Sequence, residues 1–248
     1  MVKGMDLFRQ YFSDFTEQYV LIGGAACDIS FEQTLGSFRA TRDLDIVLIV
    51  EAKSKEFGDR FWEFIQDGKY RNCAKSNGKP QFYRFDKPET PGYPSMIELF
   101  SRQEQILAEE SFITPVHIDD TVSSLSAILL DDAYYELLLN GRDVINGISI
   151  LRPSAIVPFK AKAWLDLTKQ HLSGNHVDSR SIKKHKNDII RIVTELPLEP
   201  CHISSNVKAD MIQLLEQMHI TDEELKNLKI RGVHEEDIVR VLKETYGI

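Results

Sequence analysis

The sequence is poor in cysteine and lacks any long apolar run, and each absence excludes a class of protein. Its three cysteines, Cys27, Cys73 and Cys201, are far apart and form no C-x-x-C pair, which argues against structural zinc and fits a reduced cytoplasm. The apolar runs are short and strand-like, so we expect no transmembrane span and no membrane partner. The N-terminus lacks the apolar core and cleavage site of a signal peptide, and we therefore predict a cytoplasmic protein.

The sequence also lacks an excess of positive charge and the common nucleotide-binding fingerprints. A net charge of −8 disfavours tight, non-specific binding to nucleic acid, although it leaves room for a local basic surface. The segment Gly23-Gly24-Ala25-Ala26-Cys27 is not a G-x-G-x-x-G motif, and no Gly-Lys-Ser/Thr follows it. Rossmann-type and P-loop nucleotide sites are thus excluded.

The most informative stretch runs from residue 20 to residue 50. The apolar strand Val20-Leu21-Ile22 stops at the pair Gly23-Gly24, a helix length follows, and a second apolar strand carries Asp43 and Asp45 at its start. Because side chains alternate along a strand, these two aspartates point to the same side of the sheet.

This arrangement predicts chemistry on a phosphate. Two adjacent carboxylates repel each other and need a cation, and their hard oxygen atoms suit Mg²⁺. A glycine pair between strand and helix lets a phosphate approach the backbone and the helix N–H groups. The pattern favours phosphoryl or nucleotidyl transfer, and the alternative for the acidic pair alone is a solvated turn.

The spacing of these residues resembles a known superfamily. Gly-Gly, a helix length and then Asp-x-Asp on a strand look like the nucleotidyltransferases typified by DNA polymerase beta. The string Arg39-Ala-Thr41-Arg-Asp43-Leu-Asp45-Ile resembles one branch, the AbiEii/AbiGii group of toxin-associated nucleotidyltransferases. This resemblance implies a bacterial, Mg²⁺-dependent transfer of a nucleoside monophosphate from an NTP to an acceptor, with Gly23, Gly24 and Thr41 at the nucleotide. It also implies a cognate antitoxin protein as partner.

In that superfamily a third carboxylate on a neighbouring strand completes the metal site. Glu98 is the candidate, because it is the only acid in the apolar segment Ser95–Phe100 and a lone buried carboxylate is costly. Asp43, Asp45 and Glu98 would then be both metal-binding and catalytic. The alternative for Glu98 is a salt bridge at a sheet edge, with Arg84 or Arg102.

Two further strings extend the resemblance toward residue 190. Lys160-Ala-Lys-Ala163 matches a K-x-x-A string, which implies that Lys160 binds the outer phosphates of the NTP. Lys184-His185-Lys-Asn-Asp188-Ile189 matches a K/R-D-x-x-D string, except that His185 replaces the first acid. Asp188 would orient the acceptor or act as a base. For the lysines, a solvated helix face is the alternative.

These patterns predict an α/β (α+β) fold of two domains. Residues 1–151 would form a nucleotidyltransferase-fold mixed sheet flanked by helices, and residues 152–248 a helical domain that closes over the nucleotide. Within them, the polar residues 69–80 look like a hairpin connection or a loop, and Pro158 is expected in the first turn of a helix.

A local excess of positive charge lies in the helical half. From Arg152 to Arg191 there are nine Lys/Arg against three Asp, on helices expected to face the site. This favours RNA as the acceptor, with Lys183, Lys184 and Lys186 as contacts. A catalytically idle nucleotide-binding or protein-interaction module of the same fold is the alternative function.

Overall fold

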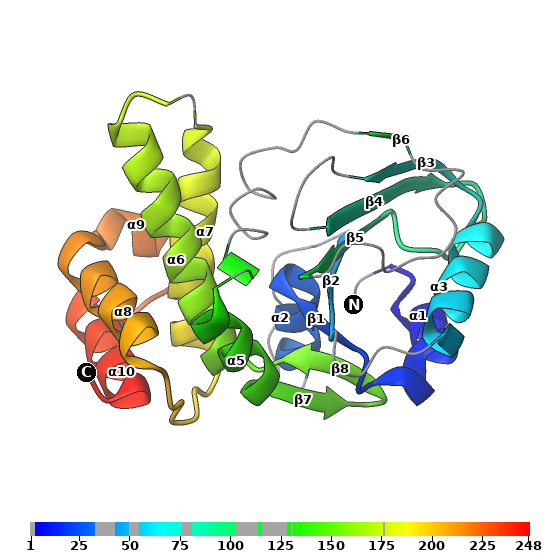
Figure 1. The fold of residues 1–248 in the computed structure, drawn as a ribbon. Helices are drawn as coiled ribbons and strands as arrows, with labels where there is room; N and C mark the ends of the chain where they lie inside the picture. Colours follow the sequence, from blue (N-terminus) through cyan, green and yellow to red (C-terminus); the bar gives the residue numbers. More distant parts are fainter. Residues whose placement is uncertain are drawn as a thin grey trace. The chain divides into compact units, whose positions relative to one another are not determined.

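The computed structural model describes residues 3–32, 43–49, 55–75, 81–102, 114–115, 128–129, 131–175 and 177–248 (Figure 1). The chain divides into two compact units. Unit 1 contains Met1–Ile118 and Arg142–Arg152, and unit 2 contains Asp119–Gly141 and Pro153–Ile248. The helix that covers residues 132–140 thus groups with the C-terminal helices, whereas the predicted boundary at residue 151 places it in the first domain.

A mixed sheet forms the centre of unit 1. In the described part of the chain it has eight strands, in the order β6-β3-β4-β5-β2-β1-β8-β7. Strands β1 and β2 are antiparallel, whereas β2 and β5 are parallel. The predicted α/β class is confirmed. The strands are β1 (Tyr19–Ile22), β2 (Asp43–Leu48), β3 (Tyr70–Lys75), β4 (Gln81–Pro88), β5 (Met96–Ser101), β6 (Thr114–Pro115), β7 (Arg142–Ile145) and β8 (Ile148–Leu151).

In its described residues, unit 1 contains four short or medium helical segments. They are α1 (Met5–Phe12), the 3-10 turn η1 (Ser13–Phe15), α2 (Gly23–Glu32) and α3 (Lys55–Gly68). Two of them, α1 and α3, pack an aromatic core against the sheet. Phe12 of α1 packs against Phe61 and Phe64 of α3, and Phe61 in turn packs edge-on against Phe85 of β4. The amphipathic spacing of α3 therefore serves the core, as its buried residues show.

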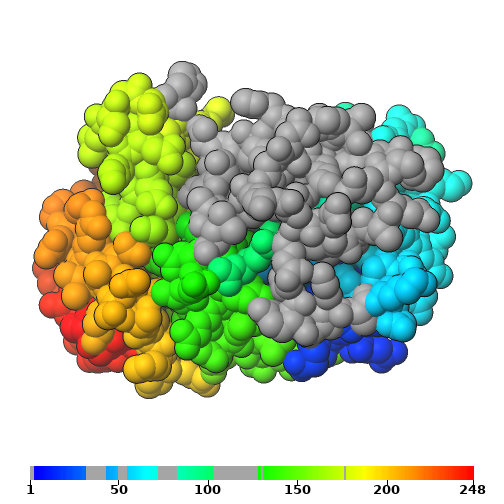
Figure 2. All heavy atoms as spheres, viewed as in Figure 1, coloured from blue at the N-terminus to red at the C-terminus, as the bar shows by residue number. Residues whose placement is uncertain are grey.

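Unit 2 is helical in its described residues. Its helices are α5 (Asp132–Asn140), α6 (Pro153–Leu172), α7 (Ser179–Glu195), α8 (Ser205–Gln217), α9 (Asp222–Asn227) and α10 (Glu235–Tyr246). A capping box formed by Thr221 and Glu224 begins α9. Atoms of α8, in orange, and of α10, in red, lie side by side on the surface (Figure 2). Lys208 of α8 donates to the carbonyl oxygen of Gly247, the residue that follows α10.

Two local predictions are wrong. Residues 70–75 form a strand, because their backbone pairs with β4 although their side chains are mostly polar. Pro158 lies inside α6, since this helix begins five residues earlier at Pro153. Pro158 has no N–H for the carbonyl of Ser154, one turn before it. The hydroxyl of Tyr246 donates to that carbonyl oxygen at 2.7 Å and so replaces the missing helical hydrogen bond.

Candidate functional site

The candidate site is a row of side chains across four adjacent strands. Asp45 of β2 pairs in register with Glu98 of β5, and Glu98 pairs with Arg84 of β4. On the other side, Asp45 pairs with Ile22, the last residue of β1 before Gly23. Because directly opposed residues share a face of the sheet, Arg84, Glu98 and Asp45 project from the same face.

That face is opposite the aromatic core of α1 and α3. Phe85, which follows Arg84 on β4, packs against Phe61 and Trp62 of α3, so the side chain of Arg84 projects away from that helix. The burial along β2 agrees with this alternation, since Asp43 and Asp45 are partly exposed while Leu44 between them is buried. The two aspartates thus share one face, as the sequence predicted.

Asp45 and Glu98 form a hydrogen-bonded carboxyl pair. Burial raises the pKa of Glu98 well above its ordinary value and the charge of Asp45 raises it further, whereas the neighbouring Arg84 lowers it. The two carboxyl groups carry hard oxygen atoms of the kind that Mg²⁺ prefers as ligands.

Arg84 is the cation already present beside this pair. Its Nη2 and Nε atoms donate to Oε1 of Glu98 at 2.6 and 2.9 Å. The side chains are 20% exposed for Arg84 and 11% for Glu98, so the contact lies largely outside bulk water. The salt bridge that the sequence left as an alternative for Glu98 is present. The salt bridge leaves Glu98 in contact with Asp45. The two acids therefore remain together, as a metal site requires.

Gly23 is the one position where this site requires a glycine. Its φ angle is +65°, in the left-handed region that other residues adopt at a cost. A Cβ atom added there would overlap Oδ2 of Asp45. The backbone at the start of α2 therefore lies directly against the Asp45 carboxylate. Gly24 follows in the first turn of the same helix, and both glycines are part of the helix rather than of a turn before it.

The donor set fits Mg²⁺ in its chemistry. Among the described residues, no group of three His, Cys, Asp or Glu side chains is placed to hold a metal ion. Mg²⁺, however, is usually bound through one or two carboxylates, with water and substrate phosphates as its other ligands. Asp43 and Asp45, with Glu98 in contact with Asp45, supply hard oxygen donors of this kind.

Lys160 and Asp188, which the sequence assigned to separate roles, contact each other inside unit 2. The Nζ atom of Lys160 on α6 donates to Oδ2 of Asp188 on α7 at 2.7 Å. Their side chains are 9% and 1% exposed. This buried ion pair joins two helices and favours a structural role for both residues. Thr41 lies outside the described residues.

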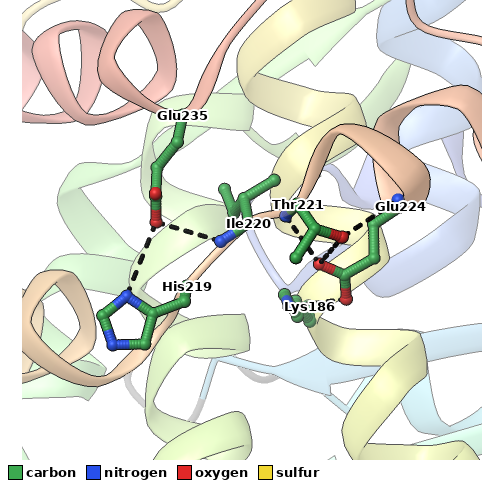
Figure 3. A network of polar contacts seen from close by, with 6 residues as sticks. All are labelled: Lys186, His219, Ile220, Thr221, Glu224 and Glu235. Carbon is green, nitrogen blue, oxygen red and sulfur yellow. Dashed lines mark hydrogen bonds and ion pairs between the residues drawn. The ribbon is translucent and has the colours of Figure 1, made fainter.

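The three lysines assigned to RNA are not equivalent. Lys183 and Lys184 are exposed on α7. Lys186 is 15% exposed and donates to Glu224 of α9 at 2.6 Å, within the network that also contains Thr221 (Figure 3). Other cations of the basic stretch are also paired in the structure: Lys160, Lys162, Arg180 and Arg191 each contact an Asp or Glu. The local positive charge is therefore smaller than the sequence count implies.

Within the described residues, no helix is long and apolar enough to cross a membrane.

Comparisons with known proteins add one likeness. No protein-family model matches the sequence, and no curated protein matches it either. Among solved structures, the chain is similar to an antigenic nucleotidyltransferase-like protein from Paracoccidioides brasiliensis, with 15% sequence identity, a TM-score of 0.42, and coverage of 97% of this chain and 94% of that chain.

Proposed function

We propose that this chain is a Mg²⁺-dependent nucleotidyltransferase that moves a nucleoside monophosphate from an NTP to an acceptor. The observation that carries the proposal is the contact of Asp45 with Glu98 on one side and with the backbone of Gly23 on the other. Carboxylates beside a glycine at a helix N-terminus combine a place for a metal ion with a place for a phosphate.

In this proposal the chain binds and aligns the two reactants. One or two carboxylates of the set Asp43, Asp45 and Glu98 would hold Mg²⁺ together with substrate phosphates, and the first N–H groups of α2, at Gly23 and Gly24, would receive the triphosphate. The bound ion would neutralise the charge that develops on the leaving pyrophosphate. The acceptor hydroxyl would lose its proton to a carboxylate of the site, and its oxygen would then form the bond to the α-phosphate as the bond to the leaving pyrophosphate breaks.

The experiment that tests this function offers total cellular RNA as the acceptor. The pure protein is incubated with each α-labelled NTP and total cellular RNA, with Mg²⁺ or with EDTA. We expect a labelled product only with Mg²⁺, and none with Asp45→Asn, which keeps the size of the side chain. Label transfer that persists in EDTA or in Asp45→Asn would contradict the proposal.

The contact of Arg84 with Glu98 favours one alternative, a catalytically idle nucleotide-binding module. In such a protein the guanidinium would permanently take the place of a metal ion. Mg²⁺-dependent binding of an NTP analogue without transfer to RNA, to protein or to small hydroxylated compounds would support this alternative.

We also propose that the acceptor is RNA and that the chain is the toxin half of a bacterial toxin–antitoxin or phage-defence pair. The AbiEii/AbiGii resemblance of the string from Arg39 to Asp45 supports the biological setting, and exposed Lys183 and Lys184 support a nucleic-acid contact. An enzyme that consumes NTPs on a cellular acceptor needs restraint, so a neutralising antitoxin protein is the expected partner. Growth arrest on expression of the wild type, but not of Asp45→Asn, would be the first test.

A further inference from the structure

Arg84 lies beside the acidic row, by which we mean Asp43, Asp45 and Glu98. An inference about its effect on metal binding rests on the proposed metal site at these three residues. Arg84 is placed by register directly beside Glu98, and Glu98 is placed directly beside Asp45. The guanidinium contacts Glu98 through two N–H groups on one oxygen atom. The order across the sheet is thus cation, acid, acid.

A fixed cation at this position has two opposite effects. In the metal-free protein it compensates the charge of the buried Glu98 and of the partly exposed Asp45, which would otherwise repel each other. When a divalent cation approaches the same acids, the guanidinium repels it. Removing Arg84 changes the charge beside the carboxyl groups by one unit, whichever protonation state they hold.

We propose that Arg84 is a built-in competitor that lowers the affinity of the acidic row for a divalent cation and stabilises the metal-free fold in exchange. Arg84 acts on the bound ion through Glu98 and is a positioning residue, not a catalytic one. Its replacement by a neutral residue strengthens metal binding and weakens the metal-free protein.

The test measures Mn²⁺ binding, by the electron paramagnetic resonance signal of free Mn²⁺, and thermal unfolding in EDTA and in Mn²⁺. We expect Arg84→Gln to bind Mn²⁺ about tenfold more tightly than the wild type, since one unit charge at close range is worth at least that factor. Its Tm should fall in EDTA, and Mn²⁺ should raise it more than it raises that of the wild type. Arg84→Lys keeps the charge and should retain the wild-type Mn²⁺ affinity.

Arg71→Gln is the matched control. It removes the same charge from unit 1, but from an exposed pair with Glu89 at 2.7 Å, and should leave Mn²⁺ affinity unchanged. A purely structural Arg84 would lower the Tm equally in EDTA and in Mn²⁺. If Arg84→Gln is unfolded in EDTA, saturating Mn²⁺ should refold it, and failure to do so overturns the proposal.

The outcomes separate this proposal from the proposed function. Equal or weaker Mn²⁺ binding by Arg84→Gln, with wild-type binding that is lost in Asp45→Asn, overturns the role of Arg84 and leaves the metal site standing. No Mn²⁺ binding by the wild type or by Arg84→Gln overturns both.

Discussion

Asp45 on β2 and Glu98 on β5 lie opposite each other on parallel strands and share a hydrogen bond. They are separated in sequence by an entire helix and two strands, so the sheet alone brings them together. Burial and mutual repulsion make this pair unfavourable as two free carboxylates. The fold maintains it between Arg84 and the glycine at the start of α2.

The first prediction concerns the two aspartates of β2. Asp43→Asn and Asp45→Asn should each lower the rate of nucleotide transfer by about a hundredfold or more, the scale of losing one group that stabilises a transition state. In EDTA the Tm should hold or rise, because one of the repelling charges is gone. Label transfer and thermal melting measure the two effects. Parallel losses of Tm and activity in both variants would instead indicate a structural pair.

The second prediction concerns the glycine beside Asp45. Gly23→Ala should destabilise the protein and lower Mn²⁺ affinity, since its Cβ displaces the Asp45 carboxylate. Gly232→Ala is the matched control, because Gly232 has a φ of +70° but no atom within 4 Å of an added Cβ. Urea unfolding should show a cost of about 1–2 kcal/mol for the control, the strain of the left-handed backbone. An equal cost in both variants, with Mn²⁺ binding intact, would show that strain alone explains the glycine.

The features that depend only on neighbouring residues were predicted well from the sequence. The apolar strand predicted at Val20-Leu21-Ile22 is β1, which is one residue longer, because the apolar run and the glycine pair after it determine its bounds. The same-face placement of Asp43 and Asp45 follows from the strand period alone. Glu98 was identified as exceptional because an acid within an apolar strand requires a partner.

Pairings between distant segments were not predictable in the same way. Lys160 and Asp188 are 28 residues apart, and Lys186 and Glu224 are 38 apart. No local pattern distinguishes a lysine that forms a buried pair from one on a solvated face, because the difference arises only when two helices pack. Strand β3 escaped prediction for a related reason, since its pairing with β4 outweighs the low strand preference of its polar residues.

The third prediction distinguishes a structural from a nucleotide-binding Lys160. Lys160→Met and Asp188→Asn should each cost about 3–5 kcal/mol of unfolding free energy, because each leaves a buried charge without its partner. The double variant Lys160→Met/Asp188→Leu should recover much of this loss. Lys162→Met serves as control, since Lys162 is 29% exposed and its pairs should be worth less than about 1 kcal/mol. Unchanged stability with weaker NTP binding in Lys160→Met would restore the triphosphate role.

The fourth prediction concerns the proline inside α6. Tyr246→Phe should cost about 1–3 kcal/mol, because it leaves the buried carbonyl of Ser154 without a donor. In the background of Pro158→Ala the same change should cost clearly less, since the substituted alanine supplies the backbone N–H that proline lacks. A double-mutant cycle by urea unfolding measures the difference. Equal costs in the two backgrounds would refute the compensation between Tyr246 and Pro158.

The last prediction tests RNA as the acceptor. Reversal of charge at Lys183 and Lys184 should weaken labelling of RNA and leave NTP binding and the Tm unchanged, because both side chains are exposed on α7. Lys186→Glu must be tested separately, since it breaks the ion pair with Glu224 and should lower the Tm for a structural reason. Wild-type RNA binding should weaken with salt by a slope of about 0.7 per phosphate neutralised on a single strand, and the double reversal should reduce that slope. Labelling that survives the double reversal, or that occurs only on small hydroxylated compounds, would exclude this face as an RNA contact.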